Sequence, residues 1–283
     1  MGGVRVVRPK WVRAAGVCAV VGLLASCGGG GGGGFGAFPV ERGAEKAVGK
    51  GGSQRAASQG AGSAARLVEE SFGLLAETTS VRMTAVLEAP DGEQRTTLHL
   101  DREGNCTGSV DAGPMKRGDV IVLADGRMWL RYSERALAEV RAEAERRGPE
   151  IAARVRERTA MASGKYLRLP RTAAFSDGMC DLDKAQSTLP GARPVRSGEV
   201  RRRPAVTRDG QRVVPVTGPR GAAGEETLYV AASGKPSLVA ITGEQQGRSL
   251  EIGFSGYGTK VLAGPPPREQ ELVLRGGGGL LEV

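Results

Sequence analysis

The 283-residue sequence predicts an α+β fold, in which a strongly curved antiparallel β-sheet of about ten strands carries helices packed on its concave side. Three observations lead to this prediction. Apolar and polar residues alternate in about ten short segments, tight turns such as Asp-Gly join most of these segments, and helical spacing of apolar residues occurs at the start and in the middle. A sheet of that size cannot lie flat, so it should curl around the helices.

The first expected element is an amphipathic helix over residues 63–79. Leu67, Phe72 and Leu75 recur at helical spacing with acidic residues between them, and Ser63 suits the N-cap position. One stripe of this helix should therefore be buried against another element.

A meander of five strands should follow the helix. Val81, Met83 and Ala85 alternate with polar residues, which indicates a strand with one apolar face. Asp91-Gly92 is a hairpin signal, and the short later connections imply antiparallel pairing. The expected strands are 81–88, 96–101, a segment after Asn105 that ends at Val110, 120–124 and 127–132.

A charged helical insert is expected at residues 133–162. A narrow apolar stripe that includes Leu137 runs along its first helix, Gly148-Pro149 ends that helix, and a second helix continues to Met161. Most of the surface of both helices is polar, so we expect the pair to cover one opening of the sheet rather than form its core.

The last third of the chain returns to strands. The expected strands are 166–169, 205–208, 211–217, 226–231, 237–243 and 249–257, and a short helix is expected at 180–189. Pro265, Pro266 and Pro267 should stop the sheet. We expect the glycine-broken tail that follows to be frayed.

The N-terminus has the pattern of an export signal that ends at a lipid-modified cysteine. Residues 1–13 carry four basic and no acidic side chains. The uncharged run of about eleven residues that follows is too short for a transmembrane helix, which needs roughly 20. Leu24-Ala25-Ser26-Cys27 predicts cleavage before Cys27 and its diacylglyceryl modification. The alternatives are a short hydrophobic anchor or a secretory signal that is cleaved elsewhere.

Four parts are expected: a signal peptide 1–26, a lipid-anchored Gly-rich linker 27–62, a folded domain 63–265 that contains the insert, and a flexible tail 266–283. The linker composition cannot bury enough apolar surface to fold. The formal charge of +9 falls to +5 without the signal, which favours anionic lipid headgroups but does not indicate nucleic-acid binding. Arg201-Arg202-Arg203 could contact such headgroups or form a solvated strand edge.

Two cysteines remain beside Cys27 after cleavage. Cys106 and Cys180 form an even set outside the cytoplasm, where disulfides persist, so we expect them to pair. Such a bridge would stabilise the fold by up to roughly 4 kcal/mol. Metal ligation together with His99 is the alternative, although the spacing matches no zinc site.

No catalytic constellation is visible in the sequence. His99, the single histidine, alternates with Leu98 and Leu100 and should face solvent, and neither Gly-x-Ser-x-Gly nor His-Glu-x-x-His occurs. Glu88 and Glu251 occupy ordinary solvent-facing positions and do not form an evident acid and base pair. We therefore expect no enzymatic activity, no cofactor and no metal.

Several segments, taken in chain order, indicate a family. They are Leu24-Ala25-Ser26-Cys27, Glu77-Thr78-Thr79-Ser80-Val81, Gly104-Asn105-Cys106-Thr107-Gly108, Asp125-Gly126-Arg127-Met128-Trp129-Leu130, Cys180-Asp181-Leu182-Asp183, Glu226-Thr227-Leu228-Tyr229-Val230 and Gly234-Lys235-Pro236. In this order they resemble the LolA-like lipoproteins of actinobacteria, in particular the mycobacterial LppX and LprG type of lipid-carrying lipoprotein. The resemblance covers most of residues 65 to 265.

This resemblance implies a half-open β-barrel that holds the acyl chains of a lipid or glycolipid between its concave face and the helices. The chain is only 4% aromatic, so its own side chains should leave part of such a hollow unfilled. Each buried CH2 of an acyl chain would contribute roughly 0.8 kcal/mol. Candidates to line the cavity, with ordinary core packing as the alternative for each, are Leu67, Phe72, Leu75, Val81, Met83, Ala85, Leu98, Leu100, Trp129 and Phe254.

The sequence therefore predicts a monomeric lipoprotein on the outer face of the cytoplasmic membrane that binds or carries a lipid or glycolipid. The alternative is a non-catalytic tethered scaffold or interaction module that docks onto another envelope protein.

Overall fold

The computed structural model describes residues 51–89, 92–169, 180–189, 200–218, 226–245 and 247–273. The expected signal peptide, Cys27 and the first part of the expected linker lie outside these ranges, as does the tail from residue 274. Their predicted roles stay predictions.

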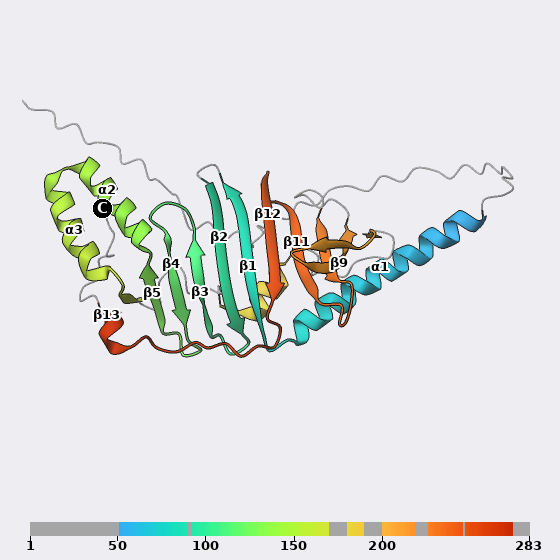
Figure 1. The fold of residues 1–283 in the computed structure, drawn as a ribbon. Helices are drawn as coiled ribbons and strands as arrows, with labels where there is room; N and C mark the ends of the chain where they lie inside the picture. Colours follow the sequence, from blue (N-terminus) through green and yellow to red (C-terminus); the bar gives the residue numbers. More distant parts are fainter. Residues whose placement is uncertain are drawn as a thin grey trace, which may run out of the picture.

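A curved, unclosed sheet forms the body of the protein (Figure 1). Its order is β13-β6-β5-β4-β3-β2-β1-β12-β11-β10-β9-β7, with β8 also paired to β9. All pairs are antiparallel except β13 with β6. The strands are β1 (Ser80–Ala89), β2 (Gly92–Asp101), β3 (Cys106–Asp111), β4 (Arg117–Val122), β5 (Met128–Tyr132), β6 (Tyr166–Leu169), β7 (Arg201–Arg202), β8 (Val206–Arg208), β9 (Gln211–Thr217), β10 (Thr227–Ala231), β11 (Leu238–Gln245), β12 (Arg248–Ser255) and β13 (Glu271–Leu272). The predicted fold class is confirmed.

Tight turns set the order of the first five strands, as expected. Gly126 has φ +79°, which glycine adopts without strain, at the turn between β4 and β5. A pairing that no local signal predicts joins the two halves of the chain. In β1, Met83 lies opposite Leu98 of β2 and also opposite Phe254 of β12, so the first strand becomes a central one.

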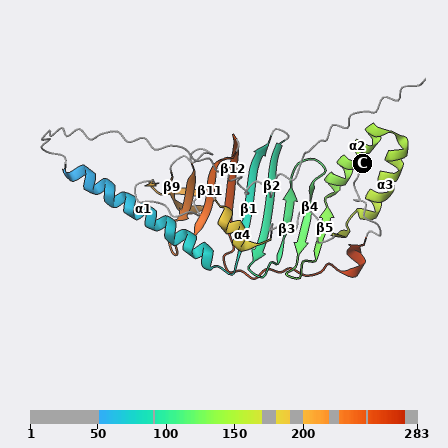
Figure 2. The same cartoon turned by 180° about the vertical axis from the view of Figure 1, so that it is seen from behind.

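Helix α1 (Gly51–Glu77) begins twelve residues before the expected start at Ser63. The added segment, which reaches into the expected linker, holds four glycines and three alanines, so intrinsic helix propensity does not account for the extension. Ala64, Val68 and Leu75 are buried at helical spacing. The helix contacts β7, β10 and β11 on one face of the sheet and runs on past the β9 end (Figures 1 and 2).

The charged insert forms a helical hairpin, α2 (Glu134–Arg147) and α3 (Pro149–Ala162). Gly148, with φ +122°, reverses the chain between them. Leu137 packs against Leu167 of β6, which places the hairpin at the β5 and β6 end of the sheet. An ion pair of 2.6 Å between Arg117 of β4 and Glu139 of α2 fixes its position. The insert therefore covers one end of the sheet, as its polar surface predicts.

The segment after β12 departs from the expected frayed tail. Residues 256–267 run along one rim of the sheet (Figure 1), a 3-10 turn η2 (Arg268–Gln270) follows, and β13 then pairs in parallel with β6. Trp129 Nε1 donates to Glu271 Oε1 over 3.1 Å. This partner is 142 residues away, so local sequence signals could not reveal the pairing.

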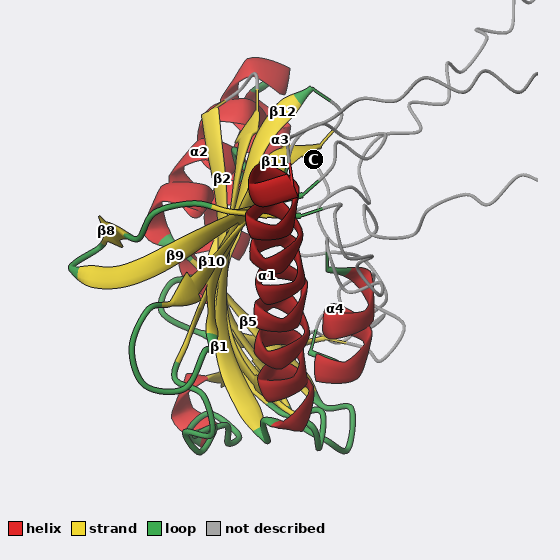
Figure 3. Ribbon diagram, turned by 90° about the vertical axis from the view of Figure 1, so that its right-hand side faces the viewer, coloured by secondary structure: helices red, strands yellow, loops and turns green. Residues whose placement is uncertain are grey.

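Helix α4 (Leu182–Thr188) lies on the same side of the sheet as α1 (Figure 3). The disulfide between Cys106 and Cys180, whose Cα atoms are 5.5 Å apart, ties the start of this element to β3. Gln186 Nε2 donates to the carbonyl of Leu75 over 2.6 Å, and Arg102 binds both Asp183 and the Ala76 carbonyl. These contacts hold α4 beside the C-terminal end of α1.

Candidate functional site

Alternation along the strands gives the sheet two chemically different faces. The side chains that lie across from one another on neighbouring strands, such as Met83, Leu98 and Phe254, share one face. We call it the apolar face. On it lie apolar side chains from β1 to β5 and β9 to β12, and α1 and α4 pack over it. The opposite side carries charged and hydroxyl side chains, and we call it the polar face.

The apolar face contains most of the residues that the sequence predicted as cavity lining. Nine of the ten belong to, or pack against, one continuous apolar cluster. Five of them are buried, namely Leu75, Val81, Leu98, Leu100 and Phe254, and four are half-buried, namely Leu67, Phe72, Met83 and Ala85. The half-buried residues are apolar groups that the described chain covers incompletely.

Trp129 does not join this group, which corrects the prediction. It pairs with Ile121 and Arg168 on the polar face, and the Arg127 guanidinium lies 5.6 Å from its ring centroid. The sequence Met128-Trp129-Leu130 is apolar on both sides of the strand, so alternation alone could not assign the tryptophan to one face. Only Met128 of this strand is part of the large apolar cluster.

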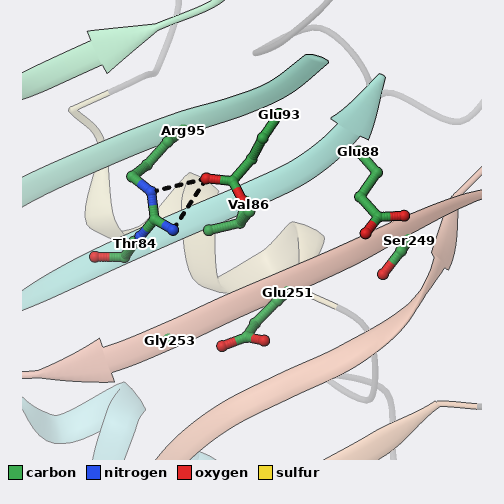
Figure 4. A pocket seen from close by; sticks show the side chains of 8 residues that line it. All are labelled: Thr84, Val86, Glu88, Glu93, Arg95, Ser249, Glu251 and Gly253. Carbon is green, nitrogen blue, oxygen red and sulfur yellow. Dashed lines mark hydrogen bonds and ion pairs between the residues drawn. The ribbon is translucent and has the colours of Figure 1, made fainter. Parts of the chain in front are cut away.

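A depression of about 260 Å³ lies on the polar face, where β1, β2 and β12 meet (Figure 4). Its lining residues are Thr84, Val86, Glu88, Glu93, Arg95, Ser249, Glu251 and Gly253. Arg95 Nη2 and Glu93 Oε1 pair at 3.0 Å, and Arg208 Nη2 binds Glu251 Oε1 at 2.6 Å. The sequence placed Glu88 and Glu251 at ordinary exposed positions, and the hollow between them depends on a strand pairing that the sequence did not reveal.

His99 is buried rather than solvent-facing, with 8% exposure. Its Nε2 lies 3.0 Å from the Thr259 carbonyl oxygen, which also accepts from Ser80 Oγ at 2.5 Å. The rim segment after β12 thus covers His99, although the alternation of residues along its strand predicts that its side chain faces solvent. No described carboxylate or nucleophile completes a catalytic arrangement with this ring.

Two polar groups lie in surroundings of low polarity. Burial raises the pKa of Tyr257, which packs against the apolar cluster and donates its hydroxyl to the Leu238 carbonyl over 2.6 Å. Burial also raises the pKa of Glu226 at the start of β10. Such surroundings disfavour charge and favour apolar contacts.

No group of three or more histidine, cysteine or acidic residues within the described ranges is placed to hold a metal ion. In the same ranges, no helix combines the length and apolar character that crossing a membrane requires.

Solved structures to which this chain is similar include two mycobacterial proteins. LprF from Mycobacterium bovis has 15% sequence identity and a TM-score of 0.48, with 72% of this chain and 97% of that chain covered. The lipoprotein LppX from Mycobacterium tuberculosis has 11% identity and a TM-score of 0.43, with 72% and 99% covered. A LolA superfamily protein from Nitrosomonas europaea has 10% identity and a TM-score of 0.23, with 71% and 94% covered.

The sequence itself matches no protein-family model and no curated protein. LppX and a LolA superfamily protein, the group that the sequence resembles, are thus among the solved structures to which this chain is similar.

Proposed function

We propose that this chain is a membrane-anchored lipoprotein that binds or carries a lipid or glycolipid on its apolar face. The apolar face is the observation that carries the proposal. Nine residues expected to line a lipid site gather there from α1, β1, β2 and β12, and four of them are only half-buried. An acyl chain would complete their burial, and each CH2 that it buried would contribute roughly 0.8 kcal/mol.

The acyl chain would lie between α1 and the centre of the sheet. Phe72 of α1 and Met83 and Ala85 of β1 are half-buried and pack against the same cluster, so they supply the contact surface. Binding by burial requires no catalytic group, and we propose no enzymatic role. The charged hollow on the polar face is unsuited to an acyl chain because its carboxylates and Arg95 would lose hydration.

The proposed anchor is Cys27, which carries a diacylglyceryl group after removal of residues 1–26. Residues 27–50 would then connect the membrane to the start of α1. This arrangement would hold a monomer at the outer face of the cytoplasmic membrane, where its lipid is available.

Native mass spectrometry of the mature protein, purified without detergent, tests the proposal. We expect a noncovalent adduct of lipid mass, released on denaturation, while the covalent anchor on Cys27 remains with the chain. Protein that stays free of adduct after purification and after incubation with lipid extract would contradict lipid carriage without contradicting the anchor.

A further inference from the structure

Residues 200–218, which contain β7, β8 and β9, form the most one-sided run of charge in the folded part, and we call them the basic arm. They carry Arg201, Arg202, Arg203, Arg208 and Arg212 against Asp209 alone, a net charge of +4. The meander over residues 80–132 has eight acidic and seven basic side chains. We propose that the basic arm is the surface that faces an anionic lipid bilayer.

Four of these arginines are available to a partner. Arg201, Arg202, Arg203 and Arg212 are exposed, and none of them forms an ion pair with another described residue. Arg208 differs, because it binds Glu251 at 2.6 Å and lies 4.5 Å from the ring centroid of Tyr229. Free guanidinium groups at a surface are attracted to the phosphates of anionic lipids, whereas the pairing of Arg208 fixes the arm to the sheet.

An exposed apolar residue lies between Arg203 and Arg208 in the sequence of the arm. Val206 of β8 is 44% exposed, although valine usually prefers the interior, and Pro204 and Ala205 precede it. An exposed segment that carries both basic side chains and a small apolar group suits the boundary between headgroups and acyl chains, since the charges can meet phosphates while the apolar group enters the boundary.

The arm also lies at the end of the sheet that the proposed anchor approaches. Helix α1 contacts β7 and then runs past this end (Figure 1), while α2 and α3 lie at the opposite end. If residues 28–50 act as the flexible tether that their composition predicts, they span about 25–30 Å on average. The inference rests on the proposed anchor at Cys27, which would keep this end of the molecule close to the membrane.

A tryptophan placed at each end of the sheet in turn tests how the protein is oriented relative to the bilayer. The acylated full chain is reconstituted in vesicles of phosphatidylglycerol and acyl-brominated phosphatidylcholine, with Val206→Trp in one variant and Met161→Trp of α3 in the other. The two sites have matched exposures of 44% and 48%, and the remaining Trp129 is buried. We expect brominated lipid to quench Val206→Trp and to leave Met161→Trp unchanged. The quenching should be lost with neutral lipid or at about 1 M salt, where the Debye length is about 3 Å.

A second experiment neutralises three arginines of the basic arm. The triple variant Arg201→Gln, Arg202→Gln and Arg203→Gln should lose most of the quenching. A matched triple variant of exposed arginines on α3, Arg154→Gln, Arg156→Gln and Arg158→Gln, should retain it. Equal quenching at both ends of the sheet would overturn the proposal, and so would quenching that does not depend on lipid charge.

Vesicle flotation separates this inference from the anchor. A chain that does not float with vesicles would contradict acylation of Cys27. Coupling the Cys27 thiol to a maleimide lipid then provides the same tether, and the comparison of the two tryptophan positions again supports or overturns the orientation.

Discussion

The two faces of the sheet differ sharply although the same strands supply both. On β1, Met83 packs into the apolar cluster beneath the helices, while its neighbour Thr84 points to the other side and pairs with the Thr97 hydroxyl at 3.2 Å. The apolar face is covered by α1 and α4, and the polar face by ion pairs and a rim segment. The apolar face therefore provides contact area away from water, whereas the polar face provides hydration and fixed charge. We therefore expect a lipid site only on the apolar face.

The largest expected effect separates the faces in terms of stability. Leu100→Ala on the apolar face should lower the free energy of unfolding by about 2–5 kcal/mol, because it removes a side chain that is 1% exposed and leaves a cavity. Thr97→Ala on the same strand, but on the polar face, should cost less than about 1 kcal/mol. Urea unfolding of both variants measures the difference in the free energy of unfolding. Equal losses of stability would contradict the expected difference between the two faces.

Removal of the disulfide should uncover the apolar face selectively. The bridge closes a loop between positions 74 residues apart, so the double variant Cys106→Ala and Cys180→Ala should lose up to roughly 4.5 kcal/mol on the chain-entropy model. Its loss frees α4 at residue 180, and binding of an apolar fluorescent dye should increase below the unfolding transition. A dye signal that stays at the wild-type level would show that α4 remains in place without the bridge.

A smaller effect is expected for the polar face. Arg208→Gln removes the ion pair with Glu251 and the contact with the Tyr229 ring, which together should contribute about 1 kcal/mol. Lipid binding on the other face should not change. A lipid defect in this variant, measured beside its thermal unfolding, would show that the two faces are not independent.

The smallest effect concerns pH. Burial raises the pKa of Glu226 in the folded state, so the fold binds its proton more tightly than the unfolded chain does. Ionisation then weakens the fold as pH rises from the ordinary glutamate pKa of about 4.3 through the raised value. Glu226→Gln removes this loss, and its melting temperature should exceed that of the wild type at neutral pH but not at pH 4. If Glu226→Gln raised the melting temperature equally at both pH values, ionisation of Glu226 would not be the cause.

The local part of the fold is predictable from sequence, and the non-local part is not. Alternation around Val81 and Met83, with a glycine turn such as Gly126, suffices for the meander because each strand pairs with its chain neighbour. The pairing of β1 with β12 and the parallel contact of β13 with β6 join segments more than 100 residues apart, and no local pattern encodes them.

The candidate site shows the same division. Nine of the predicted lining residues come from single-sided apolar patterns and belong to or pack against the apolar cluster, whereas Trp129 lies in a segment that is apolar on both sides. His99 follows the alternation yet is buried, because the rim segment near Thr259 crosses the outward face there. Burial by a distant segment is a tertiary property, and the residue pattern around His99 does not contain it.

The most direct test of lipid carriage compares two neighbouring half-buried residues on opposite faces. Met83→Gln and Thr84→Gln are purified without detergent, checked by circular dichroism, and measured by native mass spectrometry for bound lipid per chain. Ala85→Trp, which fills space on the apolar face and keeps it apolar, is measured beside them. We predict that Met83→Gln and Ala85→Trp lose bound lipid while Thr84→Gln retains the wild-type amount. Equal lipid occupancy in all three folded variants would contradict a lipid site on the apolar face.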